Sequence, residues 1–495
     1  MAQKKQTAKK QFWETITVPQ KGRGKKPVLD ELKSFKEKDP DYKHLKTWSL
    51  VYYLGEEHTE FMHRVYGEYF SANGLNPMAF QSLKRFETEV IQMTANLHHG
   101  GENAAGVMTS GGTESCLLAV KTYRDHGRNV KGIKRPNMVI PKTAHVAWEK
   151  GGEYFGVQII RAPLGKDYRV DPKAVKKMVN KNTVMILGSA PEYPHGLIDP
   201  IEKLGETALA KKIPLHVDAC VGGYILPFQE KLGHDIPLWD YRVPGVTSIS
   251  ADTHKYGYSA KGTSTITYRD IDYLTHQFFV YENWPGGVFA SPALLGTRPG
   301  GAYAAAWAAL QSIGEDGYME ITKKTMDTVE KLIRGIEDIP ELEIIGSPKS
   351  SLFAYKSKDK DVNIYAVGDV MEEKGWHIDR LQFPEALHAM VTALHADVVK
   401  KYIDDLKKSV ARVKAHPELA ESGGAAMYGM IASIPLRGMV RKNVLKMFAR
   451  MYGPDAKMID PGNVELEGEG KEQGPGDFAE KAAMWYIKMK RRFSK

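Results

Sequence analysis

The spacing of apolar residues changes along the chain and predicts two kinds of structure. Between residues 42 and 100, apolar side chains such as Trp48, Val51 and Phe61 recur at three- and four-residue spacing, the period of an amphipathic helix. From about residue 105 to 330, short β-branched runs alternate with helical stretches. The runs are 137–140, 156–160, 183–187, 213–217, 246–250 and 264–267. Strands that alternate with helices predict an α/β domain with a mostly parallel sheet.

The same changes of pattern divide the chain into five segments. We expect a basic flexible tail over 1–40, a helical segment over 41–104 and the large domain over 105–330. A smaller α+β domain over 331–455 follows, and then a Gly- and Glu-rich linker with a basic segment over 456–495.

The amino-acid composition is that of an ordinary globular protein. Of its 495 residues, 42% are hydrophobic and 26% are charged, which excludes a disordered or collagen-like chain. No apolar stretch approaches the ~18–20 residues of a membrane span, and no secretory signal is visible. We therefore expect no transmembrane span and a cytoplasmic location.

Charge and cysteine usage exclude two further classes of site. The first 26 residues hold eight basic residues and one acid, Glu14, so the tail carries seven of the nine net positive charges. With the body nearly neutral, we expect no specific nucleic-acid partner. Only Cys116 and Cys220 occur, outside any CxxC or Cys/His cluster, which predicts a reducing compartment and no metal site.

Four segments of the α/β region carry candidate chemistry. Glycines and hydroxyls at 109–115 precede a helical run, where backbone N–H groups and the helix dipole suit an anion. Asp218 ends one buried strand, at the sheet edge where α/β proteins bind ligands. His254 and Lys255 follow another strand; desolvation there should lower the pKa of a lysine and favour its amine as a nucleophile. His145 follows a third strand, where its ring could stack on a planar group.

One cofactor would use all four segments: pyridoxal 5′-phosphate. Its phosphate needs an anion cradle, its ring nitrogen needs a carboxylate and its aldehyde needs an amine. Each segment alone has a commoner structural explanation, such as a capped turn, a salt bridge or a solvated surface lysine. Their combination favours the cofactor.

At this point the sequence resembles the sphingosine-1-phosphate lyases, within the fold-type I pyridoxal phosphate enzymes and close to the group II decarboxylases. The resemblance runs from about residue 48 to at least 317. It rests on the segments 111–115 (GGTES), 194–200 (PHGLIDP), 213–220 (IPLHVDAC), 245–258 (GVTSISADTHKYGY) and 298–301 (RPGG). The long run at 245–258, with Lys261 six positions after Lys255, distinguishes these lyases from general amino-acid decarboxylases.

The resemblance implies a role for each candidate residue. Lys255 would carry the cofactor, Asp218 would pair with the ring nitrogen and His145 would stack on the ring. The cofactor phosphate would be held by Gly112, Thr113, His254 and, from a partner subunit, Thr297. The substrate phosphate would be held by Tyr52, Lys261 and Asn76.

Asn76 departs from the family pattern, which has His at this position. Asparagine can donate a hydrogen bond but cannot carry a positive charge, so this departure bears on substrate-phosphate binding and not on the cofactor chemistry.

The implied reaction is a retro-aldol cleavage of a phosphorylated sphingoid base to a long-chain aldehyde and phosphoethanolamine, in a homodimer with shared sites. The general base stays open among Lys255, Lys261, a tyrosine and the cofactor phosphate. Two alternatives remain at this point: an amino-acid decarboxylase of the same fold, and a non-catalytic pyridoxal phosphate- or lipid-binding protein.

Overall fold

The computed structural model describes residues 18–433 and 437–453. These residues form two compact units. The larger unit comprises residues 42–358 and 388–405. The smaller unit takes its described residues from 18–41, 359–387 and the part of the chain after 405. The C-terminal linker and basic segment expected over 456–495 lie outside the described residues, as do the first 17 residues of the expected tail.

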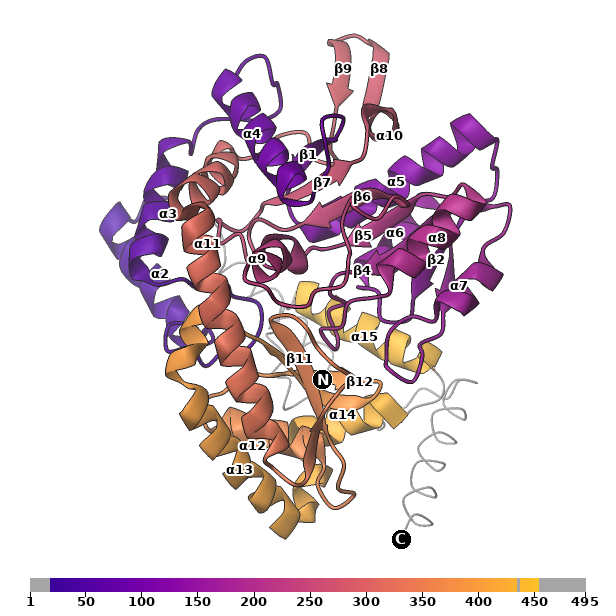
Figure 1. The fold of residues 1–495 in the computed structure, drawn as a ribbon. Coiled ribbons are helices and arrows are strands. Elements are labelled where there is room, and N and C mark those ends of the chain that lie inside the picture. Colours follow the sequence, from indigo (N-terminus) through magenta and orange to yellow (C-terminus); the bar gives the residue numbers. More distant parts are fainter. Residues whose placement is uncertain (1–17, 434–436, 454–495) are drawn as a thin grey trace, which may run out of the picture. The chain divides into compact units, whose positions relative to one another are not determined.

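A seven-stranded sheet forms the centre of the larger unit, with the order β1-β7-β6-β5-β4-β2-β3 (Figure 1). Pairs among β2 to β6 are parallel, and β7 is antiparallel to both of its neighbours. The strands are β1 (Ala105–Thr109), β2 (Asn137–Pro141), β3 (Gln158–Ala162), β4 (Thr183–Ser189), β5 (Leu215–Asp218), β6 (Val246–Ala251) and β7 (Ser264–Tyr268). The mostly parallel α/β sheet expected from the sequence is therefore confirmed.

All six expected runs contain strands, and β1 was not expected. This strand has only two β-branched residues, Val107 and Thr109, and it contains Gly106. Its pairing with β7 along five residues, Val107 opposite Ile266, stabilises it. Tertiary pairing rather than local propensity places this strand.

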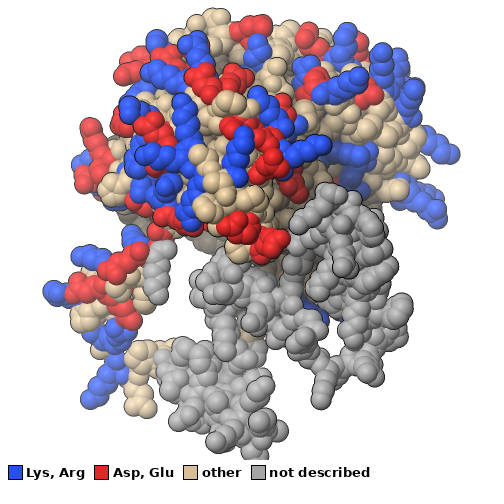
Figure 2. Space-filling model, turned by 90° about the horizontal axis from the view of Figure 1, so that it is seen from below, with Lys and Arg blue, Asp and Glu red and all other residues tan. Residues whose placement is uncertain are grey.

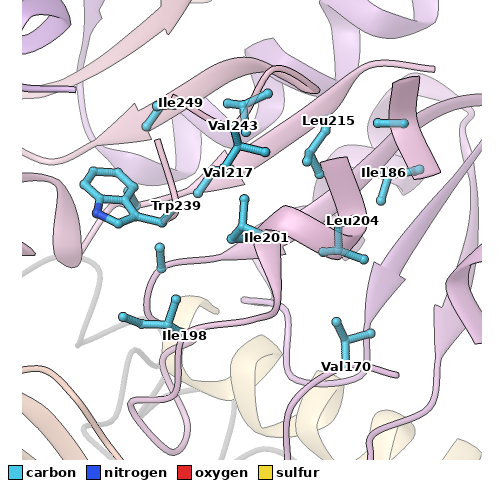
Figure 3. Packing of buried hydrophobic residues seen from close by; sticks show 14 of the residues in the cluster. Val170, Ile186, Ile198, Ile201, Leu204, Leu215, Val217, Trp239, Val243 and Ile249 are labelled. Carbon is cyan, nitrogen blue, oxygen red and sulfur yellow. The ribbon is translucent and has the colours of Figure 1, made fainter. Parts of the chain in front are cut away.

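Helices cover both faces of the sheet. The helices before and around it are α3 (Glu56–Glu68), α4 (Gln81–Leu97), α5 (Gly112–Lys131), α6 (Ala147–Phe155), α7 (Pro172–Met178), α8 (Ile201–Lys211), α9 (Leu226–Lys231) and α10 (Ile271–Thr275). On one face, Ile201 and Leu204 of α8 pack on Ile186, Leu215 and Val217 (Figure 3). On the other face, residues of α5 and α6 form a second core with β2, β4 and β7. Full burial of one such side chain contributes about 1.5–3 kcal/mol.

Alternation along β5 sets the direction of the site residues. Leu215 and Val217 belong to the core under α8, so His216 and Asp218 lie on the opposite face, where both contact Trp148 of α6. His216 is fully buried, and its two ring nitrogens hydrogen-bond the hydroxyls of Ser248 (2.7 Å) and Ser250 (3.1 Å) on β6. Burial lowers the pKa of His216 to about 4.

After the sheet comes the β8 (Phe279–Trp284) and β9 (Gly287–Ser291) hairpin, and then the long helix α11 (Gly300–Glu337). Gly314, with φ +64° and ψ 176°, interrupts the helical geometry of α11 and produces a kink. The domain boundary expected at residue 330 falls inside this helix. The larger unit instead continues through β10 (Leu342–Ile344) and β11 (Leu352–Ser357) to residue 358.

Strand β12 (Asp379–Gln382) lies in the smaller unit, and strand β13 (Glu385–Met390) begins there and ends in the larger unit. The smaller unit also contains α2 (Lys25–Phe35), α12 (Ile364–Glu373), α14 (Gly423–Ser433) and α15 (Arg437–Tyr452), while α13 (Val399–Ala415) crosses the division between the units. α2 lies within the stretch expected as a flexible tail, and none of its residues is buried.

Two surface properties bear on partners. On the face shown in Figure 2, lysines and arginines are mixed with acidic residues, as expected for a body close to neutral. Within residues 18–433 and 437–453, no helix is both long enough and apolar enough to cross a bilayer.

Candidate active site

A pocket of about 340 Å³ opens in the larger unit where β4, β5 and β6 end and α5 begins. Six of the residues expected from the sequence line it: Gly112, Thr113, His145, Asp218, His254 and Lys255. They come from four separate segments, which the parallel strands bring to one edge of the sheet. The fold therefore assembles the central group of candidates in one place.

The start of α5 forms one wall of the pocket. Backbone N–H groups in the first turn of a helix have no intrahelical partners and carry the positive end of the helix dipole, so they suit an anion. At Gly112 a β-carbon would lie 2.7 Å and 2.8 Å from the carboxylate oxygens of Asp252 and 2.9 Å from Cys220 Sγ. Only glycine fits there. Glu114 braces the loop by accepting hydrogen bonds from the N–H groups of Ser110 (2.7 Å) and Leu294 (2.8 Å).

His254 completes this wall with a defined tautomer. Its Nδ1 accepts a hydrogen bond from the Thr263 N–H (3.2 Å), which leaves the ring proton on Nε2. Burial lowers the pKa of His254, against the opposing effect of the Asp252 carboxylate. A neutral His254 can donate from Nε2 to an anion at the start of α5.

Asp218 is buried at the end of β5 with both oxygens engaged. Its Oδ2 accepts a hydrogen bond from Trp148 Nε1 (2.9 Å), and its Oδ1 accepts one from the Cys220 N–H (3.1 Å). Burial alone would raise the pKa of Asp218, but the Trp148 hydrogen bond and the nearby rings of His145 and His216 outweigh it, so the pKa is lowered. The pocket therefore presents a fixed, ionised carboxylate.

Lys255 is paired with Asp252, a contact the sequence did not indicate. Its Nζ lies 2.9 Å from Asp252 Oδ2, and 23% of its side chain is exposed, at the pocket. Burial acts to lower the pKa of Lys255, but the Asp252 carboxylate, together with smaller contributions from Tyr52 and Cys220, outweighs it and raises the pKa well above the ordinary value. The expectation of a lowered pKa was wrong because it considered desolvation without this partner. Asp252 Oδ2 is also placed to take the proton that Lys255 must lose to act as a nucleophile.

His145 lines the pocket, and part of the residue is open to solvent. The Ala147 N–H donates to its Nδ1 (3.2 Å), and Tyr193 contacts the ring edge-on, with centroids 6.2 Å apart. The surroundings lower the pKa of His145, chiefly through burial, and favour the neutral ring. A neutral, open aromatic face suits stacking on a planar group.

Tyr52 and Lys261 form a pair beside this pocket. Lys261 Nζ lies 4.9 Å from the centre of the Tyr52 ring and donates to the carbonyl oxygen of His254 (3.3 Å). Burial, with a further contribution from the charge on Lys255, lowers the pKa of Lys261 to about 8. Burial raises the pKa of Tyr52, which keeps its hydroxyl protonated.

Asn76 and Thr297 are not among the residues that line this pocket. Both are exposed. Asn76 Oδ1 accepts a hydrogen bond from the Met78 N–H (2.9 Å), and Thr297 Oγ1 lies 3.4 Å from Asn73 Nδ2. Within one chain, Asn76 and Thr297 therefore join neither the six candidates that line the pocket nor the Tyr52–Lys261 pair beside it.

The sequence reasoning missed two residues that shape the site, Asp252 and Trp148. Asp252 precedes Lys255 by three positions in the SADTHK run, and Trp148 follows His145 by the same number. Both spacings can be read in the sequence. A role for either residue becomes clear only in the fold, where Asp252 contacts Lys255 and Trp148 contacts Asp218.

The pocket matches the chemistry of pyridoxal 5′-phosphate. A glycine-lined helix start fits a phosphate, an ionised carboxylate fits a protonated ring nitrogen, and a lysine amine fits an aldehyde. Gly112 contributes by lacking a β-carbon, which would collide with Asp252 and Cys220, so the start of α5 can lie against these two pocket residues.

Comparison with known proteins agrees. A family model described as the pyridoxal-dependent decarboxylase conserved domain matches residues 83–358. A sphingosine-1-phosphate lyase of Arabidopsis thaliana is 43% identical over 446 residues, which cover 88% of this chain and 81% of the relative. The solved structure of a sphingosine-1-phosphate lyase from Burkholderia pseudomallei is 37% identical, with a TM-score of 0.79 and coverage of 88% of this chain and 97% of that one.

A glutamate decarboxylase from Lactobacillus brevis has a TM-score of 0.70, with coverage of 81% of this chain and 96% of that one. At 23% identity it shows a shared fold and nothing further. The expected fold-type I architecture and the pyridoxal phosphate cofactor are thus confirmed. With 43% identity to one sphingosine-1-phosphate lyase and 37% to another, this chain belongs to the sphingosine-1-phosphate lyase family of pyridoxal-dependent enzymes.

Proposed function

We propose that the protein cleaves a phosphorylated long-chain sphingoid base into a long-chain aldehyde and phosphoethanolamine. The observation that carries the proposal is the pair of Lys261 and Tyr52 beside the pocket of Lys255 and Asp218. A cation is thereby available for a second phosphate, next to a site already suited to the cofactor phosphate. Family membership supports this reaction over amino-acid decarboxylation.

Four residues would hold the cofactor's phosphate and its aldehyde carbon. The start of α5 at Gly112 and Thr113, with His254 Nε2, would bind its phosphate, and Lys255 would bind its aldehyde carbon. When bound, the cofactor supplies an electron-withdrawing ring that stabilises the carbanion left by carbon–carbon cleavage.

The chain's own residues set the protonation of the site. Asp218, kept ionised by Trp148 and the neighbouring histidine rings, would hold a proton at the ring nitrogen. Asp252 would hold the proton that Lys255 gives up. His145 would cover one face of the ring and exclude water from it.

The direct test is a product assay. Purified protein is incubated with cofactor and a phosphorylated sphingoid base in detergent micelles, and aldehyde and phosphoethanolamine are quantified separately. We expect equal amounts of the two products, and much slower turnover of the same base without its phosphate. Release of carbon dioxide from an amino acid, with no aldehyde from the phosphorylated base, would contradict the proposal and favour a decarboxylase.

Lys261→Met should weaken binding of the substrate phosphate more than it slows the chemical step. A hydrogen bond to a charged group is worth about 1.5–3 kcal/mol, so we expect KM to rise roughly 10- to 150-fold with a smaller change in kcat. Lys203→Met is the matched control, because Lys203 is a surface lysine paired with Glu206 outside the pocket. With the unphosphorylated base as substrate, the Lys261 effect should disappear; an equal effect on both substrates would contradict the assignment.

The pH dependence of KM also tests whether Lys261 binds the substrate phosphate, and it does so in the wild-type protein, where Lys261 keeps its charge at neutral pH. Because the pKa of Lys261 is about 8, its ammonium is present below that pH and is lost above it. KM for the phosphorylated base should therefore rise with pH through about pH 8–9, and Lys261→Arg, which stays charged, should flatten the rise.

We further propose that the working enzyme is a homodimer in which Asn76 and Thr297 serve the pocket of the other copy. Both residues are exposed, and neither is among the residues that line the pocket of their own chain. Large apolar side chains at Phe279, Val280 and Trp284 are exposed on the nearby β8–β9 hairpin. Light scattering should give twice the mass of one chain; a fully active monomer would contradict the proposal.

We also propose that the protein works in the cytoplasm. Cys116 and Cys220 are both buried free thiols, as is typical of a reducing compartment. Cell fractionation should place the lyase activity in the cytosolic fraction; activity confined to sedimented membranes would contradict this location.

A further inference from the structure

Cys116 and Cys220 are buried thiols that the proposed reaction does not use. Cys116 lies in the first turns of α5, and Cys220 follows β5 by two residues, so both are placed at the same edge of the sheet. The two Sγ atoms and a carboxylate oxygen of Asp218 all lie within 4.8 Å of one another. The sequence shows no CxxC or Cys/His motif at either cysteine, so this meeting of the two thiols arises from the fold.

The spacing of these atoms approaches that of a tetrahedral metal site. With metal–sulfur bonds of about 2.3 Å and metal–oxygen bonds of about 2.0–2.2 Å, neighbouring ligand atoms in a tetrahedron lie about 3.5–3.8 Å apart. Cys116 Sγ lies 3.9 Å from Asp218 Oδ2. Small shifts of the Cys116, Cys220 and Asp218 side chains would therefore allow all three to coordinate one ion.

The donor set and its surroundings favour a thiophilic cation. Two thiolates and one carboxylate suit Zn²⁺ or Cd²⁺ and leave a fourth position for water. Hydrogen bonds already orient the ligands: Trp148 donates to Asp218, and the Cys220 thiol lies 3.3 Å from Ser250 Oγ. All three ligands line the pocket, so an ion can reach them from solvent.

We propose that Cys116, Asp218 and Cys220 bind one thiophilic divalent cation in the cofactor-free protein. The ion replaces the two thiol protons, which leave to solvent, and it uses the carboxylate that the cofactor's ring nitrogen needs. Ion and pyridoxal phosphate therefore compete for Asp218, and a cation bound early would delay loading of the cofactor. The competition rests on the cofactor assignment made above, whereas ion binding itself does not.

Cadmium binding to the full-length, cofactor-stripped protein tests the proposal, because thiolate–Cd²⁺ bonds absorb in the ultraviolet. With a phosphine reductant present, we expect one Cd²⁺ per chain and this thiolate band. Cys116→Ser and Cys220→Ser should each weaken binding at least about tenfold, the size of effect that even outer contacts of metal sites produce. Ser189→Ala is the matched control, because Ser189 lines the same pocket outside the cluster and should leave Cd²⁺ affinity unchanged.

A second measurement uses the wild-type protein alone, so it can be made even if the serine variants do not fold. Protein whose cofactor has been fixed by borohydride reduction should take up no Cd²⁺ at this site, and Cd²⁺-loaded protein should acquire the yellow cofactor chromophore several-fold more slowly. Equal Cd²⁺ uptake by stripped and cofactor-fixed protein, or a thiolate band unchanged in the double serine variant, would overturn the proposal.

Discussion

Lys255→Ala is expected to abolish product formation, with a loss of at least about three orders of magnitude in kcat/KM. Removing a residue that acts covalently commonly has an effect of this size or larger. The reason is local: of the lysines in the described part of the chain, Lys255 alone lines the pocket. The measurement is the aldehyde assay, combined with borohydride reduction and mass spectrometry to locate the trapped cofactor.

Lys261→Ala is the matched control for this prediction. It removes a second lysine close to the site but leaves Lys255 and its ion pair with Asp252 in place. Borohydride should still fix the cofactor on Lys255 in this variant, and on no residue in Lys255→Ala. A cofactor trapped on Lys261 in the wild-type protein would show that the two roles had been exchanged.

Asp218→Asn should leave the cofactor bound but slow turnover by about 10²- to 10⁴-fold, the range typical of positioned proton-transfer groups. Asparagine retains an oxygen that can accept the Trp148 hydrogen bond, so the wall of the pocket should persist. It carries no charge, however, and cannot hold a proton on a ring nitrogen. The variant therefore removes the charge of Asp218 while keeping the packing of its side chain. The quantity to measure is kcat.

Trp148→Phe provides the comparison, because it removes the indole donor while Asp218 keeps its charge and the Cys220 N–H contact. We expect a much smaller fall in kcat than for Asp218→Asn, together with a raised pKa of Asp218. Near wild-type kcat in Asp218→Asn, with the chromophore retained, would show that this carboxylate has no electronic role.

The sheet and the main site residues could be predicted because both follow local rules. Short β-branched runs between helical patterns place the strands, and parallel strands bring Asp218 and Lys255 to one edge of the sheet. The β1 strand could not be predicted because its residues have no strong preference for strand structure. The strand forms through its pairing with β7.

Features that depend on contacts between distant segments could not be predicted. The Asp252–Lys255 ion pair depends on the turn after β6, and the meeting of Cys116 with Cys220 depends on how α5 packs against β5. The position 330, expected as a boundary, lies inside α11, whose helical pattern continues past the kink at Gly314 without a break in composition. Asn76 and Thr297 lie outside the pocket of their own chain, so their roles stay a prediction.

The buried imidazole of His216 has a consequence for acid unfolding. In the folded protein this ring titrates at about pH 4, against about 6.5 when it is free in solution. Unfolding between these values takes up a proton, so His216 supports the fold fully above about pH 6.5 and progressively less as the pH falls toward 4. The urea midpoint should decline across this interval, and His216→Gln should remove part of the decline. The hydrogen bonds that join β5 to β6 through one neutral ring thus make the centre of the sheet sensitive to mild acid.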